Sequence, residues 1–304
     1  MSTPAPGSGR VHVSVFGETH IGRVRAENQD NLLIADLRVG DRANLAHAAT
    51  DRGAGPACLE LGSEGALLLV ADGMGGAAGG SRASGLAVTA IHEHVLDRWG
   101  AKPERTPERF ARCLSEALEA ANRRIHEEAA HDDRYRGMGT TATLAGLLRD
   151  SVYFAQVGDS RAYILRAGTA VQVTRDQSLV QDFIDAGMLT EDEARTSAHR
   201  GQVLQALGVG AAVRPHMTFH ELRRDDIVLL CSDGLSRVVE SHEMVATARE
   251  TDDLAEACHR LVDLANERGG PDNITVVAAR LGGEGLARAG PDAVTRRAYR
   301  QPEQ

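Results

Sequence analysis

Two Asp-Gly pairs, each at the end of an apolar run, constrain the fold of this chain more than any other feature. Residues 67–71 are apolar and lead into Asp72-Gly73, and residues 227–231 lead through Ser232 into Asp233-Gly234. A short apolar run that ends in Asp-Gly predicts a buried strand with a carboxylate at its tip. Either pair alone is also typical of an ordinary turn. Two such tips, so far apart in the chain, can meet only through the fold.

Three further aspartates lie at predicted strand boundaries. Asp159 follows the apolar run 152–157, Asp272 precedes the run 274–279, and Asp30 precedes the run 32–35. Carboxylates that gather at one end of a sheet repel each other and raise each other's pKa. Divalent cations take oxygen ligands and would neutralise such a cluster. The five aspartates therefore favour a metal site.

The motifs that carry these aspartates resemble those of the bacterial metal-dependent serine/threonine phosphatases of the protein phosphatase 2C (PPM) family. Each motif is weak alone, but the five occur in order over residues 12–282: Arg25-x-x-Asn28-Gln29-Asp30, Asp72-Gly73-Met74-Gly75-Gly76, Val157-Gly158-Asp159-Ser160-Arg161, Ser232-Asp233-Gly234-Leu235 and Asp272-Asn273-Ile274-Thr275. The resemblance implies an α+β fold, an αββα four-layer sandwich in which two antiparallel β-sheets are flanked by helices, with metals in a cleft at one end.

The resemblance also implies a role for each matching residue. Asp72 would bridge two Mn²⁺ or Mg²⁺ ions, and the backbone carbonyl of Gly73 would bind one of them. Asp233 and Asp272 would bind the first ion, and Asp30 would act on the second ion directly or through bound water. Asp159, together with Asp233, matches a third-ion site. Arg25 would bind the substrate phosphate, because a guanidinium suits bidentate oxygen recognition. The expected reaction is attack of a metal-bridging hydroxide on a phosphoserine or phosphothreonine monoester.

Some positions depart from the family pattern or need a second interpretation. Gln29 stands where many relatives have Glu, and Met74 stands where eukaryotic relatives have a His that is a candidate general acid. Gln177 lies where His is frequent, at the start of a flap over residues 176–207 that the resemblance implies. Asn273 is expected to stabilise a turn. His20, near the Arg25 loop, is expected to be a hydrogen-bonded residue.

Composition excludes several classes of function. The net charge is -9 and aromatic residues make up 3%, which argues against nucleic-acid binding. No apolar run reaches the length of about 20 residues needed for a membrane span, and residues 1–9 lack a signal-peptide core, so we expect a cytoplasmic protein without membrane contact, and a monomer.

The four cysteines have no Cys-x-x-Cys spacing and predict no structural zinc. Cys231 beside Asp233 lacks the basic neighbours of a nucleophilic thiol.

We expect one catalytic domain at residues 11–282 between a flexible N-terminus (1–10) and a disordered tail (283–304). Residues 37–65 read as a loop insertion, and residues 11–36 as two strands joined by the Arg25 loop. One helix is expected from about Ser81 to Trp99. A second is expected to start at Thr106-Pro107, with Pro107 at the first helical position, and its buried stripe consists of Phe110, Leu114, Leu118, Ala121 and Ile125. Further elements are expected at these ranges: strands within 139–175 and at 217–221, 226–231 and 273–280, and helices at 241–249 and 253–267.

Three hypotheses about function remain open at this stage. The first is an active phosphatase that acts on phosphorylated proteins and opposes bacterial Ser/Thr kinases. The second is a catalytically weak module that binds phosphoproteins without turnover, although the complete set of acidic residues argues against it. The third is a regulator that dephosphorylates a sigma-factor antagonist.

Overall fold

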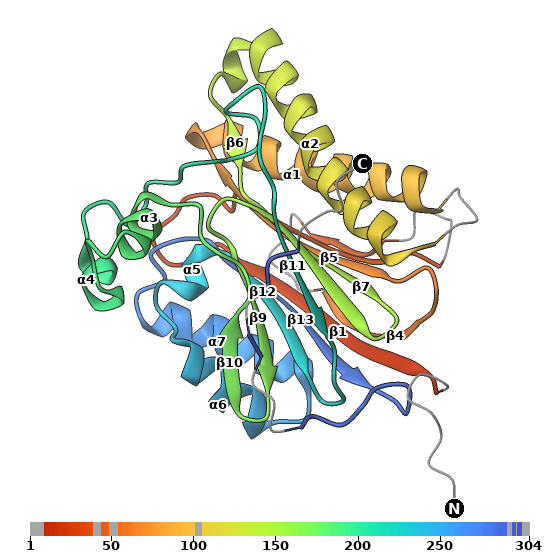
Figure 1. Cartoon of the computed structure of the whole chain (residues 1–304). Helices are drawn as coiled ribbons and strands as arrows, with labels where there is room; N and C mark the ends of the chain where they lie inside the picture. The colour runs from red at the N-terminus through yellow and green to blue at the C-terminus, as the bar shows by residue number, and fades with distance from the viewer. Residues whose placement is uncertain are drawn as a thin grey trace, which may run out of the picture.

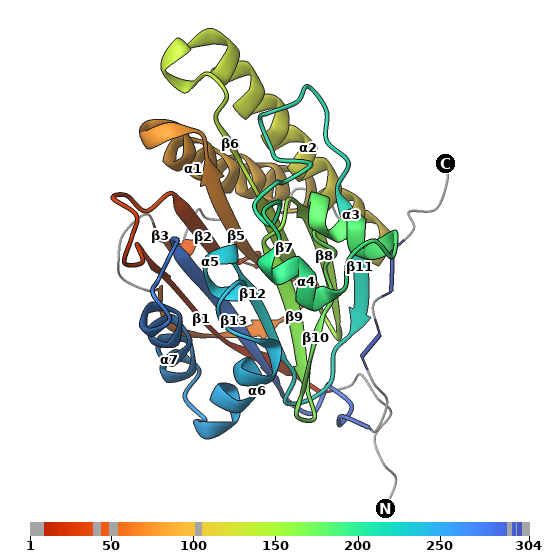
Figure 2. The same cartoon turned by 90° about the vertical axis from the view of Figure 1, so that its left-hand side faces the viewer.

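The computed structural model describes residues 9–38, 44–48, 54–100, 105–290, 294–295 and 297–299. Two antiparallel sheets lie face to face, and helices cover both outer faces (Figures 1 and 2). The αββα sandwich expected from the sequence is therefore confirmed. Within the described residues, no helix has the combination of length and apolar composition that crossing a bilayer requires.

The first sheet contains the strand that precedes Asp233 and the strand that follows Asp272. Its order is β10 (Thr169–Gln172), β9 (Arg161–Arg166), β12 (Ile227–Cys231), β13 (Ile274–Gly282), β1 (Val11–His20) and β4 (Ala54–Leu61). The helices α6 (Ser241–Glu250) and α7 (Leu254–Glu267) pack on its outer face through a cluster of buried apolar side chains that includes Leu229, Leu261 and Val276.

The second sheet contains the strands that carry Asp30 and Asp72. Its order is β11 (His216–Glu221), β8 (Ser151–Val157), β7 (Ala142–Leu148), β5 (Ala66–Met74), β2 (Asp30–Asp36) and β3 (Asn44–Ala48), and β6 (Gly139–Thr140) pairs with the end of β5. Its outer face is covered by α1 (Gly76–Val95) and α2 (Pro107–His131). The remaining short elements are η1 (Leu96–Gly100), η2 (Asp133–Tyr135), α3 (Leu179–Asp185), α4 (Glu191–Thr196) and α5 (Asp233–Ser236).

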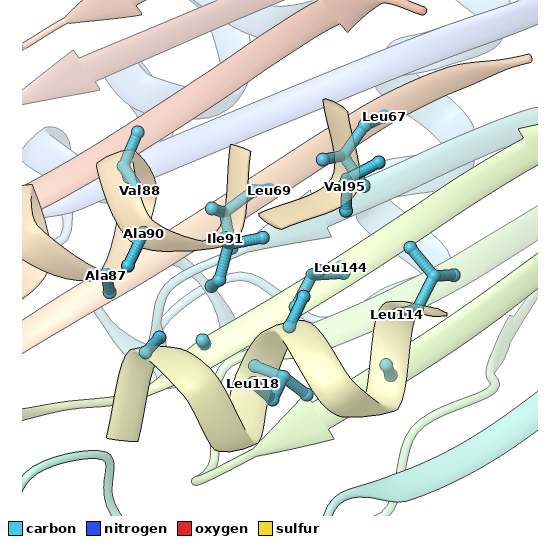
Figure 3. Close-up of a cluster of buried hydrophobic side chains, with 14 of the residues drawn as sticks. Leu67, Leu69, Ala87, Val88, Ala90, Ile91, Val95, Leu114, Leu118 and Leu144 are labelled. Carbon is cyan, nitrogen blue, oxygen red and sulfur yellow. The ribbon is translucent and has the colours of Figure 1, made fainter. Parts of the chain in front are cut away.

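The central strand β5 is apolar on both faces because both faces are covered. Successive side chains of a strand point to opposite sides. Leu67 and Leu69 accordingly pack against the helices, and Leu68 and Val70 pack between the two sheets. Figure 3 shows Leu67 and Leu69 beside side chains of α1 and α2. The continuous apolar run that predicted this strand thus reflects burial on two sides.

The helix α2 confirms the expected start and the expected buried stripe. Thr106 accepts a hydrogen bond from the backbone N–H of Arg109 at 3.3 Å, and Pro107 occupies the first turn. All five predicted stripe residues are fully buried: Phe110, Leu114, Leu118, Ala121 and Ile125. The helix α1, in contrast, begins at Gly76 and not near Ser81. The strand β5 runs directly into it, because Gly73 and Gly80 lack the side chains that would hold the two backbones apart.

The expectation of a loop over residues 37–65 is wrong for much of its length. The structure places β3 and β4 there, paired with β2 and β1 respectively. Leu59 and Leu61 are buried while Cys58 and Glu60 are exposed, so this end of β4 alternates as a strand does. Each of these strands lies at the edge of its sheet. Edge strands carry little apolar sequence, which is why the composition resembled a loop.

The expectation of a disordered tail over residues 283–304 is also wrong where the structure describes it. Leu286 and Val294 are buried in the core between the sheets. The backbone N–H of Tyr299 donates to the carbonyl of Met217 at 2.9 Å, and the backbone N–H of Phe219 donates to the carbonyl of Arg297 at 3.2 Å. This segment pairs with β11, whose outer edge would otherwise be unpaired. Most of the predicted flexible N-terminus, residues 1–8, lies outside the described part of the chain.

Candidate metal centre

The five predicted aspartates lie at strand boundaries that the fold brings to one end of the sandwich. Asp30 and Asp72 are directly opposite each other in the β2–β5 ladder. In the other sheet, Asp159 precedes β9, Asp233 follows β12 and Asp272 precedes β13, and these three strands are neighbours. The antiparallel order places the end of one strand beside the start of the next. The convergence that the sequence predicted is therefore present.

Close backbone contact holds the Asp233 and Asp272 turns together. A Cβ placed on Gly234 would lie 1.9 Å from the carbonyl oxygen of Asn273. Ser232 adds to this contact, because its Oγ accepts a hydrogen bond from the N–H of Thr275 at 2.9 Å. The glycine of the second Asp-Gly pair thus lets two carboxylate-bearing turns approach more closely than any other residue would allow.

Asp30, Asp159 and Asp233 are buried and Asp72 is half-buried, and the pKa values of all four carboxylates are raised. Burial raises the pKa of Asp72, and the charges of Asp30, Asp233, Asp159 and Asp272 raise it further. Burial also raises the pKa of Asp30 to about 7, although hydrogen bonds from Thr275 and Ser232 oppose the shift. The pKa of Asp159 is likewise about 7, through burial and the charge of Asp233. Burial raises the pKa of Asp233, while Arg237 opposes the shift. Mutual repulsion, expected from the sequence, is thus present.

Two carboxylate oxygens in this cluster are buried without a partner. Neither Oδ1 of Asp30 nor Oδ1 of Asp233 finds a hydrogen bond among the described residues. Leaving a buried charged oxygen unpaired is costly, and a cation would remove that cost. In the described residues no three acidic, His or Cys side chains already form a ligating arrangement. The chemistry of the donors nevertheless suits hard divalent ions, which prefer carboxylate and carbonyl oxygens.

Arg25 lies at the rim of this cluster. Its Nη2 donates to Oδ2 of Asp272 at 2.7 Å, and its side chain is 55% exposed. Hydrogen bonding to Asp272 raises the pKa of Arg25, and the charges of Asp233 and Asp72 act in the same direction. The guanidinium is therefore both beside the carboxylates and open to solvent.

Asn273 positions the loop that carries Arg25. Its amide donates to the carbonyls of Ile21 and Glu27 at 2.9 Å each, and its Oδ1 accepts from the N–H of Gln29 at 2.8 Å. These contacts agree with the turn-stabilising role expected from the sequence. Gln29 itself donates to the carbonyl of Gly76 at 2.9 Å, so its amide links the Arg25 loop to the start of α1.

Gly73 permits the same kind of close approach on the second sheet. A Cβ on Gly73 would lie 2.2 Å from the carbonyl oxygen of Gly80. The backbone of neighbouring Asp72 is fixed from the other side, since its carbonyl accepts from Thr140 Oγ1 and from Thr141 N–H, both at 2.8 Å. The strand tip that bears the central carboxylate is thereby held rigidly.

Sequence reasoning missed Arg237. It follows α5 directly, and its guanidinium pairs with Asp233 and lies 3.7 Å from Asp159. The signal was its position four residues after Asp233, because side chains four apart lie on the same helix face. The short helix α5 was not predicted, so this spacing was not used.

The remaining singled-out residues have structural partners. Gln177 is buried and accepts from Gly158 N–H at 2.8 Å. His20 accepts from Gly22 N–H at 2.9 Å, as the hydrogen-bonded interpretation expected. Burial raises the pKa of Cys231 to about 12, which excludes a reactive thiolate near neutral pH.

The segment predicted as a flap contains α3 and α4. Thr190 and Glu193 form a capping box at the start of α4. Phe183, Ile184 and Leu189 are half-buried, whereas Met188 is 67% exposed. The side chain of Met188 thus faces solvent in the turn after α3.

Comparison with known proteins agrees with this geometry. The family model described as Protein phosphatase 2C matches residues 57–274. The chain is 39% identical over 213 residues to the serine/threonine protein phosphatase PstP of Mycobacterium tuberculosis, which covers 70% of this chain but 40% of PstP. It is 34% identical over 218 residues to the protein phosphatase PhpP of Streptococcus pneumoniae, covering 72% of this chain and 87% of PhpP.

A solved structure of the PstP catalytic domain in complex with two manganese ions is also similar to this chain. The TM-score is 0.70 at 30% sequence identity, and the match covers 90% of this chain and 99% of the solved one. The similarity thus extends over both sheets and their flanking helices.

Proposed function

This chain belongs to the protein phosphatase 2C family, and from that premise we propose that it is a metal-dependent protein phosphatase that hydrolyses phosphoserine and phosphothreonine monoesters. Its substrates would be phosphorylated proteins, and it would reverse the action of Ser/Thr kinases. The observation that carries the proposal is the gathering of Asp30, Asp159, Asp233 and Asp272 around Asp72, with buried oxygens that lack a partner.

The carboxylates would hold two Mn²⁺ or Mg²⁺ ions. In this assignment Asp72 would contact both ions. Asp233, Asp272 and the carbonyl of Gly73 would hold one of them, and Asp30 would hold the other directly or through bound water. When bound, such a pair of ions activates a water molecule near neutral pH and neutralises charge on the transferring phosphoryl group. Thr275 keeps the Asp30 carboxylate oriented, since its Oγ1 donates to Oδ2 at 2.6 Å.

Arg25 would bind the phosphate of the substrate. A guanidinium presents parallel N–H donors that match phosphate oxygens. Its exposure at the rim places it where a phosphorylated side chain would enter. Asn273 fixes the loop that carries it, so little conformational entropy would be lost when the phosphate binds.

The test is hydrolysis of a phosphothreonine peptide with and without Mn²⁺, for the wild type and for Asp72→Asn. We expect activity only with the metal, and a loss of roughly 10²–10³-fold or more in kcat for the variant, in line with removal of a single key electrostatic group. The matched control is Asp36→Asn, at the opposite end of β2 from Asp30, which should keep wild-type activity.

Activity that persists in EDTA, or an Asp72→Asn variant as active as the wild type, would contradict the proposal. Tight binding of the phosphopeptide without turnover at any Mn²⁺ or Mg²⁺ concentration would favour a binding module in its place.

A further inference from the structure

Arg237 places a fixed positive charge between two carboxylates of the cluster. Its Nη2 contacts Oδ2 of Asp233 and lies 3.7 Å from Oδ2 of Asp159. Asp159 and Asp233 are 6% and 8% exposed, so both carboxylates lie largely out of water. An ion pair in such surroundings is screened far less than one on the surface.

The other arginine near Asp159 is engaged elsewhere. Arg161 influences Asp159 electrostatically, but its guanidinium makes a bidentate contact with Asp176, with Nη2 at 2.7 Å from Oδ2. Among the described residues around this pair of carboxylates, Arg237 is therefore the cation in contact with both. It is held by its position at the end of α5, four residues after Asp233.

The charges of the site are consistent with this arrangement. The five carboxylates of the cluster carry five negative charges when ionised. Two divalent cations together with Arg237 and with Arg25 at the rim already offset these charges, whereas a third divalent cation beside Arg237 would add to an excess of positive charge in a buried place. Two positive charges at such a short distance repel each other strongly.

We propose that the guanidinium of Arg237 takes the place of a divalent cation between Asp159 and Asp233, so that this chain binds two ions and not three. The third-ion site expected from the sequence would then be filled by a side chain of the protein itself. This inference rests on the proposed function, because it concerns the same carboxylate cluster. The unpartnered Oδ1 of Asp233, on a residue more than nine-tenths buried, shows that the pair still has acceptor capacity once the guanidinium is removed.

The experiment counts bound Mn²⁺ per chain by isothermal titration and by equilibrium dialysis with metal analysis, on wild type, Arg237→Gln, and Asp159→Asn combined with Arg237→Gln. Glutamine removes the charge but keeps a polar side chain of similar reach. We expect Arg237→Gln to bind one more ion than the wild type, and the double variant to lose that gain. In EDTA we expect a lower Tm for Arg237→Gln, and a larger rise of Tm with Mn²⁺ than the wild type shows.

Equal ion counts for the wild type and Arg237→Gln would overturn the inference, whatever the count. A gain that survives in the double variant would also overturn it, because the extra ion would not lie at Asp159. The absence of Mn²⁺ binding by the wild type would instead contradict the proposed function, and the comparison between the wild type and Arg237→Gln would still decide the role of Arg237.

Discussion

Substitution of Gly234 by alanine should separate the two turns of the metal centre. The new Cβ would lie 1.9 Å from the carbonyl oxygen and 2.8 Å from the carbonyl carbon of Asn273. Both atoms belong to the backbone, so no side-chain rotation relieves the contact. To reach even the 3.0 Å below which real Cβ contacts essentially do not occur, the turns must move apart by about 1.1 Å.

That displacement acts directly on Asp233 and Asp272, which lie beside the two contact points. A misplacement of about 1 Å can reduce catalysis about 10²-fold, and forced overpacking costs about 1–3 kcal/mol of stability. We therefore expect kcat/KM for a phosphothreonine peptide to fall about 10²-fold, together with weaker Mn²⁺ binding. The assays are steady-state kinetics at saturating Mn²⁺, calorimetric titration of the metal, and urea unfolding.

The matched control is Gly85→Ala in α1. There the nearest atom to a new Cβ is Asn31 Nδ2 at 3.9 Å, an ordinary contact, and alanine in a helix interior is favoured over glycine by about 1 kcal/mol. Gly85→Ala should keep full activity and gain stability. If Gly234→Ala binds Mn²⁺ and turns over like the wild type, close contact between these turns is not what positions the carboxylates.

Two further predictions concern stability. Leu118→Ala removes a fully buried side chain from the contact between α2 and the second sheet, and it should lower the free energy of unfolding in urea by about 2–5 kcal/mol. The control Arg112→Ala, at an exposed position of the same helix, should change the free energy of unfolding by less than about 0.5 kcal/mol. Similar losses for the two variants would refute the packing argument. Burial, together with the charges of Arg166 and Arg297, lowers the pKa of His220 to about 4. As the pH falls, His220 therefore binds a proton in the unfolded chain before it does so in the folded one. The contribution of neutral His220 to the free energy of unfolding is complete above pH 6.5 and is lost between pH 6.5 and about pH 4. When the pH is lowered from neutral to 5, the free energy of unfolding of His220→Gln should fall by roughly 1 kcal/mol less than that of the wild type, allowing for solvent screening. Equal falls for the two proteins would contradict this assignment.

The sequence predicted the central strands and the carboxylate cluster because their signals are local and strong. An apolar run such as residues 67–71 has few alternatives to a buried strand, and Asp-Gly at its end marks where the strand stops. The order of the motifs then implied that the strand tips meet. Asp30 and Asp72 are indeed opposite each other in one ladder.

The edge strands and the contact partners could not be predicted in this way. β3 and β4 are strands because their neighbours offer unpaired backbone groups, and their own side chains carry little information. Arg237 is a site residue because α5, a helix of four residues, turns it toward Asp159. Such short elements leave no periodic pattern, so their side chains are placed by tertiary structure alone.

The course of residues 294–295 and 297–299 has a practical meaning for anyone who shortens this chain. Residue 282, the end of β13, looks like a natural place to stop, since the last long strand is complete there. A protein cut at that point would lose the partners of Phe219 and Met217 and present a bare strand to its neighbours in solution. Exposed edge strands of this kind pair with each other between molecules, so the shortened protein should aggregate or self-associate under conditions in which the longer one stays in solution.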